Sequence, residues 1–160
     1  MQNFSINEII ELAVQIEQSG YNFYDNALKK KDLNEKAVKL LEKLRDEEVN
    51  HERIFKNLRT DEDFLSMGDQ VDWQAAADYL KAISDSHVFS KPEAAIKLAT
   101  ESKNEKEILV NAVQFEKDTL LFFHSIYQKA NNEKSKKIIN AIIEEEVSHV
   151  MILKDRLHSL

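Results

Sequence analysis

Cysteine is absent from this chain, and proline and glycine are scarce. The 160 residues include no Cys, two Gly and one Pro. The lack of cysteine excludes disulfides, thiol catalysis and thiolate-bound zinc or iron–sulfur centres, so any redox chemistry must use oxygen and nitrogen ligands. So little Gly and Pro, with 32% charged residues, favours long amphipathic helices over strands and tight turns. We therefore predict an all-α protein with a single domain over residues 1–160.

Long apolar runs and an excess of positive charge are also missing. Nowhere do 18 apolar residues follow one another, and the first residues show no basic region followed by an apolar stretch. The net charge of −7 argues against a partner with a phosphate backbone. We expect a soluble, cytoplasmic protein that binds neither nucleic acid nor a membrane. The sequence does not fix the oligomeric state, and a homodimer is one option.

The chain does contain an internal repeat of acidic residues and histidines. Each half carries a single Glu and then, 31 or 30 positions later, a Glu-x-x-His motif. These residues are Glu17, Glu48 and His51 in the first half, and Glu116, Glu146 and His149 in the second. Tyr24 and Phe123 each follow the single Glu by seven positions. Such a repeat suggests a duplicated helical hairpin, whose halves must pack together to bury their apolar faces.

Apolar periodicity predicts four long helices. We place them over 6–30, over 32–59, from 102 to the Asn131-Asn132 pair, and from there to the C-terminus. They would form hairpins over about 5–59 and 102–160, joined by a crossover over about 60–101. The crossover should contain a short helix over 73–83 and a helix start at Pro92. Only this crossover can span a helix of about 37 Å, so the second and third long helices should be parallel.

The six repeated residues should meet inside the bundle. Glu17 and Glu48 lie 15 and 16 positions from Asp32 at the first turn, and Glu116 and Glu146 each lie 15 positions from Asn131. Antiparallel packing would bring all four to one level. Most of their neighbours four and seven positions away are apolar, so the carboxylates should face inward.

Four buried carboxylates would repel one another or take up protons, and no Lys or Arg lies on their helix faces to balance them. Two divalent cations would balance the charge, with His51 and His149 adding one nitrogen ligand to each. We therefore predict a two-metal site with Glu17, Glu48, His51, Glu116, Glu146 and His149 as ligands. A solvated helix face is the alternative for a single Glu-x-x-His motif.

These residues resemble the rubrerythrin branch of the ferritin-like superfamily of di-iron carboxylate proteins. The resemblance covers Gln15-Ile16-Glu17 with Phe23-Tyr24, Glu47-Glu48-x-x-His51, residues 79–89, Glu116 with Phe122-Phe123, and Glu145-Glu146-x-x-His149. It implies a ferritin-like four-helix bundle that binds two iron ions, with manganese or zinc as alternatives. By the same resemblance, Glu48 and Glu146 would bridge the metals, Glu17 and Glu116 would be terminal ligands, and the substrate would be dioxygen or hydrogen peroxide.

Two departures from that family stand out. The absence of cysteine leaves no rubredoxin-like domain, so an external electron donor would be required. Val113 and Thr119 flank Glu116 where rubrerythrins carry an extra glutamate, so a site with six protein ligands fits better. Our leading hypothesis is a di-iron oxidoreductase of the peroxidase, oxidase or ferroxidase type. The alternatives are a ferroxidase-type protein for iron storage or delivery, and a bundle with a mainly structural manganese or zinc pair.

Four further residues could support such a site. Glu47 and Glu145 each precede a ligand histidine by four positions, and could hold its free imidazole N–H within one helix or from the other hairpin. Plain surface charge is the alternative. Tyr24 could relay electrons or simply belong to the core. Gly20 could allow a close helix approach or solvent access, or merely be tolerated.

Overall fold

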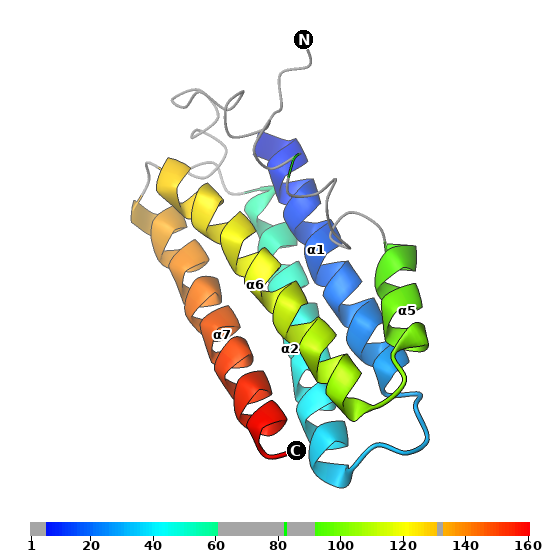
Figure 1. Ribbon diagram of the computed structural model, residues 1–160. Coiled ribbons are helices and arrows are strands. Elements are labelled where there is room, and N and C mark those ends of the chain that lie inside the picture. The colour runs from blue at the N-terminus through cyan, green and yellow to red at the C-terminus, as the bar shows by residue number, and fades with distance from the viewer. Residues whose placement is uncertain (1–5, 61–81, 83–91, 131–132) are drawn as a thin grey trace.

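The computed structural model describes residues 6–60, 82, 92–130 and 133–160, which contain five helices (Figure 1). These are α1 (Ile6–Ala27), α2 (Glu35–Leu58), α5 (Pro92–Glu101), α6 (Glu105–Lys129) and α7 (Glu133–His158). Within this part of the chain the structure has no strands, which confirms the all-α prediction. The short helix predicted over 73–83 lies outside the described residues, apart from Ala82.

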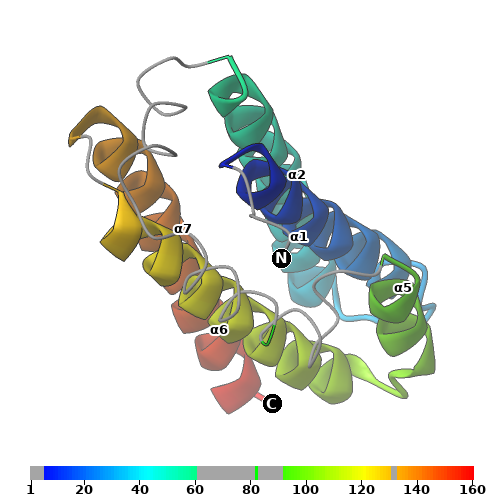
Figure 2. The same cartoon turned by 90° about the horizontal axis from the view of Figure 1, so that it is seen from above.

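The helices form two antiparallel hairpins, α1 with α2 and α6 with α7 (Figure 1). Both α2 and α6 run in the same direction. Helix α5 packs against α1 and runs in the same direction as α1. The chain therefore enters α6 at the end of the bundle where α1 finishes. Seen from above, the two hairpins lie side by side, with α5 on the outside next to α1 (Figure 2). The four long helices therefore surround one interior.

The helix ends follow local capping chemistry and correct the predicted boundaries by a few residues. The side chains of Asn34 and Asn104 accept hydrogen bonds from the backbone N–H groups of Lys36 and Glu107, at 2.9 and 3.0 Å. Helices α2 and α6 therefore begin after these asparagines rather than at the predicted positions 32 and 102. Helix α1 ends at Ala27, three residues before its predicted end. Helix α5 begins at Pro92, as predicted.

Two apolar clusters fill the interior at different levels. One joins the beginning of α1, the end of α2, the end of α6 and the beginning of α7, and it includes the Phe55–Phe123 ring pair at 5.0 Å. The other joins the opposite ends of these helices with α5, and it includes Phe23 and Leu153. Burying each large apolar side chain contributes about 1.5–3 kcal/mol, so both clusters hold the hairpins together. The level between them carries the functional residues.

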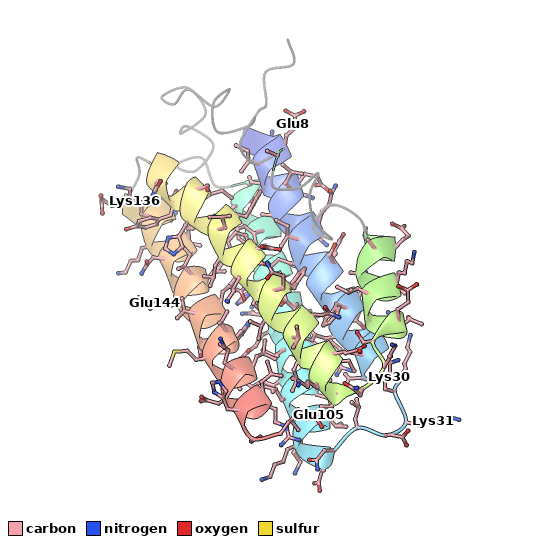
Figure 3. All side chains as sticks on the ribbon, viewed as in Figure 1. Glu8, Lys30, Lys31, Glu105, Lys136 and Glu144 are labelled. Carbon is pink, nitrogen blue, oxygen red and sulfur yellow. The ribbon has the colours of Figure 1, made fainter. Side chains whose placement is uncertain are left out.

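Charged side chains lie mainly on the outer faces of the helices and in the turns. Among those labelled in Figure 3, Glu8, Lys31 and Glu144 project outward from α1, from the first turn and from α7. No described helix has both the length and the hydropathy needed to cross a membrane. The buried charged residues described next are exceptions to this outward placement of charged side chains.

Candidate metal centre

The structure brings all six repeated residues together in the interior. Each side chain is at most 2% exposed, and each of the four long helices contributes at least one of them. The members are Glu17 from α1, Glu48 and His51 from α2, Glu116 from α6, and Glu146 and His149 from α7. Their i, i+3 and level-matched spacing places them between the two apolar clusters.

The six residues form two overlapping groups of four possible ligands. One ligand atom from each member of a group lies within 4.8 Å of the others. The first group is Glu17, Glu48, His51 and Glu146, and the second is Glu48, Glu116, Glu146 and His149. Glu48 and Glu146 belong to both groups. This arrangement suits two cations side by side. The two cations would share two carboxylates, and each would have one Glu and one His that the other does not contact.

Glu146 lies between the two histidines. Its Oε1 is 2.9 Å from His51 Nδ1, and its Oε2 is 2.9 Å from His149 Nδ1. Neither Nδ1 atom nor either oxygen of Glu146 has a hydrogen-bond partner with acceptable geometry. Two ligand atoms bound at right angles to one ion at about 2.1 Å would be about 3.0 Å apart. The 2.9 Å separations therefore fit shared coordination better than direct hydrogen bonding.

Most polar atoms of the site have no partner among the described residues. Seven of the eight carboxylate oxygens and both Nδ1 atoms are buried without a hydrogen bond. Leaving so many buried polar groups unsatisfied is costly, and native interiors rarely do so without a bound ion or protonation. Oxygen and nitrogen atoms that converge in this way can hold divalent cations, so the residues fit a pair of metal ions.

The outer nitrogens of the two histidines each face a carboxylate of the opposite hairpin. His51 Nε2 is 2.6 Å from Glu145 Oε2, and His149 Nε2 is 2.6 Å from Glu47 Oε2. An ionised carboxylate can only accept, so each Nε2 carries the hydrogen and each Nδ1 points into the site. Of the two arrangements the sequence left open, the structure therefore shows the one between hairpins. Such contacts fix the orientation of ligand histidines.

Burial makes ionisation costly for three of the carboxyl groups. Burial raises the pKa of Glu17, and burial together with the nearby Glu17 carboxylate holds the pKa of Glu48 well above its usual range. Burial and the charge of Glu146 raise the pKa of Glu116 to about 8. Without bound cations, these groups therefore tend to hold protons.

For the two histidines and Glu146, in contrast, the surroundings favour the charged form. Burial would lower the pKa of His51, but Glu146 and Glu17 outweigh it and raise that pKa to about 12. For His149, Glu116 and Glu146 likewise outweigh burial and raise the pKa to about 10. Burial opposes charge on Glu146 too, yet the two histidines lower its pKa below the usual value. The metal-free site thus holds its own protons, which cations would displace.

Two residues of α1 contact ligand carboxylates of other helices. Tyr24 is buried and donates a hydrogen bond to Glu116 Oε1, while Tyr21, three residues earlier on the same helix, is 36% exposed. At Gly20, a Cβ atom added to the backbone would lie only 2.7 Å from Cδ of Glu48. The sequence raised Tyr24 and Gly20 only as open alternatives, because the rotation of α1 relative to its neighbours decides what they touch.

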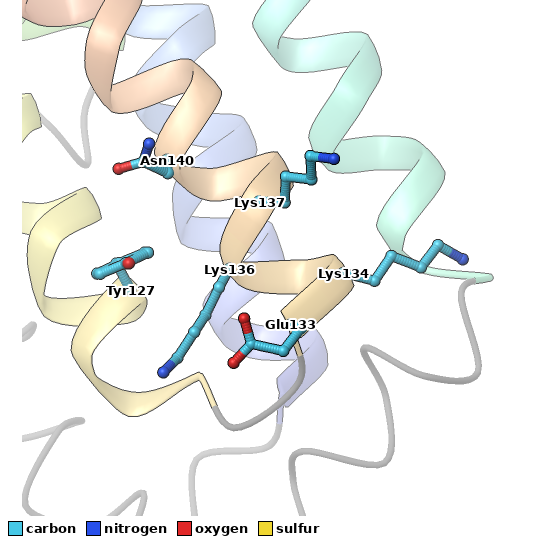
Figure 4. Close-up of a pocket in the computed structure, with 6 residues that line it drawn as sticks. All are labelled: Tyr127, Glu133, Lys134, Lys136, Lys137 and Asn140. Carbon is cyan, nitrogen blue, oxygen red and sulfur yellow. The ribbon is translucent and has the colours of Figure 1, made fainter.

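A surface pocket lies between the end of α6 and the start of α7 (Figure 4). Its lining includes Lys134, Lys136 and Lys137, with Lys136 Nζ 5.9 Å from the ring centroid of Tyr127. A lining rich in lysine does not suit a cation. Asn140, the lining residue nearest to Glu146 along the same helix, is six residues or about 9 Å from it, and none of the six repeated residues lines the pocket. The pocket is therefore separate from the buried site.

Comparison of the chain with protein-family models, with curated proteins and with solved structures gave no match.

Proposed function

We propose that this protein is a di-iron oxidoreductase with a ferritin-like bundle, which reduces dioxygen or hydrogen peroxide with electrons from an external donor. The observation that carries the proposal is the pair of four-residue ligand groups that share Glu48 and Glu146. Such sharing supports two adjacent ions rather than one. In this assignment Glu48 and Glu146 bridge the metals, and Glu17 and Glu116 are terminal ligands.

The donor set is compatible with iron as the metal. Four carboxylates and two imidazoles, without any thiolate, suit Fe(II) and Mn(II), and imidazole also suits zinc. When bound, an iron pair supplies two electrons, one from each ion, to a small oxidant. Peroxide reduction to two water molecules consumes two electrons and two protons. The proposal includes an external electron donor, because this sequence has no cysteine for a thiolate-bound redox centre.

The surrounding side chains provide what such a reaction needs from the protein. The two apolar clusters on either side of the site exclude bulk water. Glu145 and Glu47 orient the two ligand histidines, and Tyr24 holds one oxygen of Glu116. The Tyr24 hydroxyl, which comes from outside the ligand set, donates a hydrogen bond to Glu116 Oε1. It is therefore placed to hold a proton at Glu116 Oε1.

A mainly structural manganese or zinc pair is the second candidate. The near-complete burial of all six ligands favours it, because a site that only balances buried charge needs no access for a substrate. A ferroxidase-type role in iron storage or delivery would use the same ligands, but storage also requires a closed shell of many subunits.

Anaerobic loading with Fe(II), followed by dioxygen or hydrogen peroxide, tests the proposal. We expect about two irons per chain and the near-ultraviolet charge-transfer absorption of a ferric pair after the oxidant is added. The doubly substituted Glu48→Gln, Glu146→Gln protein is the matched control and should show neither. Binding without oxidation would favour a structural pair. Many irons per chain in a large assembly would favour storage, and no binding of Fe(II) at all would exclude the di-iron proposal.

A further inference from the structure

Gly20 lies on α1, one turn after Glu17, and is buried against the carboxylate of Glu48 on α2. A Cβ atom at this position would be 2.7 Å from both Cδ and Oε2 of Glu48, and 3.0 Å from its Oε1. No glycine among the described residues has a positive φ, so the backbone conformation does not require glycine here. The close approach of the carboxylate is the reason that the structure offers.

The equivalent position in the other hairpin shows that this space is not a general need of the fold. Thr119 follows Glu116 by three positions, as Gly20 follows Glu17. Thr119 is buried, and its hydroxyl donates to the backbone carbonyl of Phe115 at 2.9 Å. A helix of this bundle can therefore carry a branched side chain one turn after its ligand glutamate.

The two shared carboxylates differ in how they are held. Glu146 is fixed between two histidine nitrogens at 2.9 Å. Among the described residues, neither histidine makes such a contact with Glu48, although Glu48 belongs to both ligand groups. Gly20 leaves the room in which the Glu48 carboxylate lies.

We propose that Gly20 is a positioning residue, whose missing side chain lets Glu48 reach across to both ligand groups. The inference rests on the proposed function, since a shared Glu48 matters only to a two-ion site. Alanine is the better helix former, so helix propensity does not account for a glycine at this position. The methyl group that Gly20→Ala introduces would push the flexible end of Glu48 back toward α2. The carboxylate would then no longer belong to at least one of the two ligand groups, so the affinity for the second ion should fall most.

Titration with Co²⁺, followed by calorimetry and visible absorption, tests the proposal on Gly20→Ala. We expect about two ions in the native protein, and binding of the second ion weakened by about 10- to 100-fold in the variant, as is typical for residues that orient ligands. Thr119→Ala is the matched control from the other hairpin and should bind two ions normally. In a Glu48→Asp background the carboxylate is one methylene shorter. There Gly20→Ala should change the affinity by less than about twofold.

The metal-free variant provides readouts that do not depend on the function. Its melting temperature should equal or exceed that of the native protein, because alanine favours the helix. A crystal structure of Gly20→Ala without metal should show the Glu48 carboxylate displaced toward α2. An unmoved carboxylate, native Co²⁺ affinity, or a large drop in melting temperature would each overturn the proposal. If native protein binds two Co²⁺ ions but its iron is never oxidised, the oxidoreductase proposal fails while the role of Gly20 stands.

Discussion

The two hairpins carry the same ligand pattern in different surroundings. In α1/α2 the single Glu is followed by Gly20 and Tyr24, whereas α6/α7 has Thr119 and Phe123 at the equivalent positions. The hydroxyl of Tyr24 reaches across to Glu116, but Phe123 has no hydroxyl to return the contact to Glu17. Repetition therefore fixes the candidate ligands and their level in the bundle, and the residues one and two turns away make the two groups of candidate ligands unequal.

The two shared carboxyl groups, Glu48 and Glu146, also differ, because their pKa values are shifted in opposite directions. The pKa of Glu48 is raised, first by burial and then by the charge of Glu17. The pKa of Glu146 is lowered, because His149 and His51 outweigh its burial. In the metal-free protein, Glu146 is thus the counter-ion of the histidines and Glu48 is a buried acid that holds its proton. Removing one or the other should have different consequences.

The largest expected effect comes from replacing either shared carboxylate. Glu48→Gln and Glu146→Gln should each abolish binding of two ions, because each carboxylate belongs to both ligand groups. Metal analysis after loading and dialysis should find at most one ion per chain in either variant. Retention of two ions in both would show that the ligands are wrongly assigned.

The same two variants should differ in their free energy of unfolding without metal. Glu146→Gln leaves two buried histidines without their shared counter-charge, and removing one partner of a buried ion pair costs about 3 kcal/mol or more. Glu48→Gln removes only a carboxyl group that burial disfavours in its charged form, so it should leave the free energy of unfolding unchanged or raise it. Urea denaturation with a chelator measures both. Equal losses would mean that the two carboxylates are equivalent after all.

The contacts between hairpins should make the two halves behave alike. Glu47→Gln and Glu145→Gln each remove a charged partner 2.6 Å from a ligand histidine, so each should weaken metal binding by about 10- to 100-fold. The neighbouring Glu144, which is exposed and accepts a hydrogen bond from Asn140 on the same helix, is the matched control. If Glu144→Gln had the same effect, general surface charge would explain the result.

The sequence was sufficient to predict the four long helices and the convergence of the ligand residues. Helical periodicity assigns each Glu and His to a face, and distances from the turns assign them to a level. The sequence could not decide whether Glu47 and Glu145 contact the histidine of their own helix or the histidine of the other hairpin. Each lies one turn from a histidine, and the choice depends on how the helices are rotated relative to one another. The contacts of Tyr24 and Gly20 were undetermined for the same reason.

Helix boundaries were the other shortfall, and they have a local cause. Asp32 and Ser102 are good capping residues by type, yet Asn34 and Asn104 accept hydrogen bonds from backbone N–H groups in the first turns of α2 and α6. Where several capping residues stand close together, the sequence alone does not rank them. The predicted metal site was insensitive to these shifts, because helical spacing between ligands does not depend on where the helix starts.

A change in pH should affect the metal-free protein through both halves of the site. Without metal, the folded protein retains protons on Glu116 up to a pKa of about 8, on His149 up to about 10 and on His51 up to about 12, whereas the ordinary values are 4.5 for Glu and 6.5 for His. The folded state therefore binds more protons than the unfolded state between these values. The free energy of unfolding of the metal-free protein should therefore fall as pH rises through this range.

Metal binding should respond to pH in the opposite direction. Cations must displace the same protons, so affinity should rise over the range in which the metal-free protein loses stability. Urea denaturation with a chelator, and Co²⁺ titration, both between about pH 5 and 9, measure the two trends. Parallel trends would contradict a proton-filled site.

The smallest expected effect concerns the residue that most clearly distinguishes the hairpins. Tyr24→Phe makes α1 resemble α6 and removes the hydrogen bond to Glu116, which should lower the metal-free stability by about 1–2 kcal/mol. Tyr21→Phe, three residues earlier and 36% exposed, is the control and should change it by less than about 0.5 kcal/mol. If the two variants lose equally little, the buried hydroxyl does not support the ligand, and Tyr24 serves only to fill the core beside Phe23.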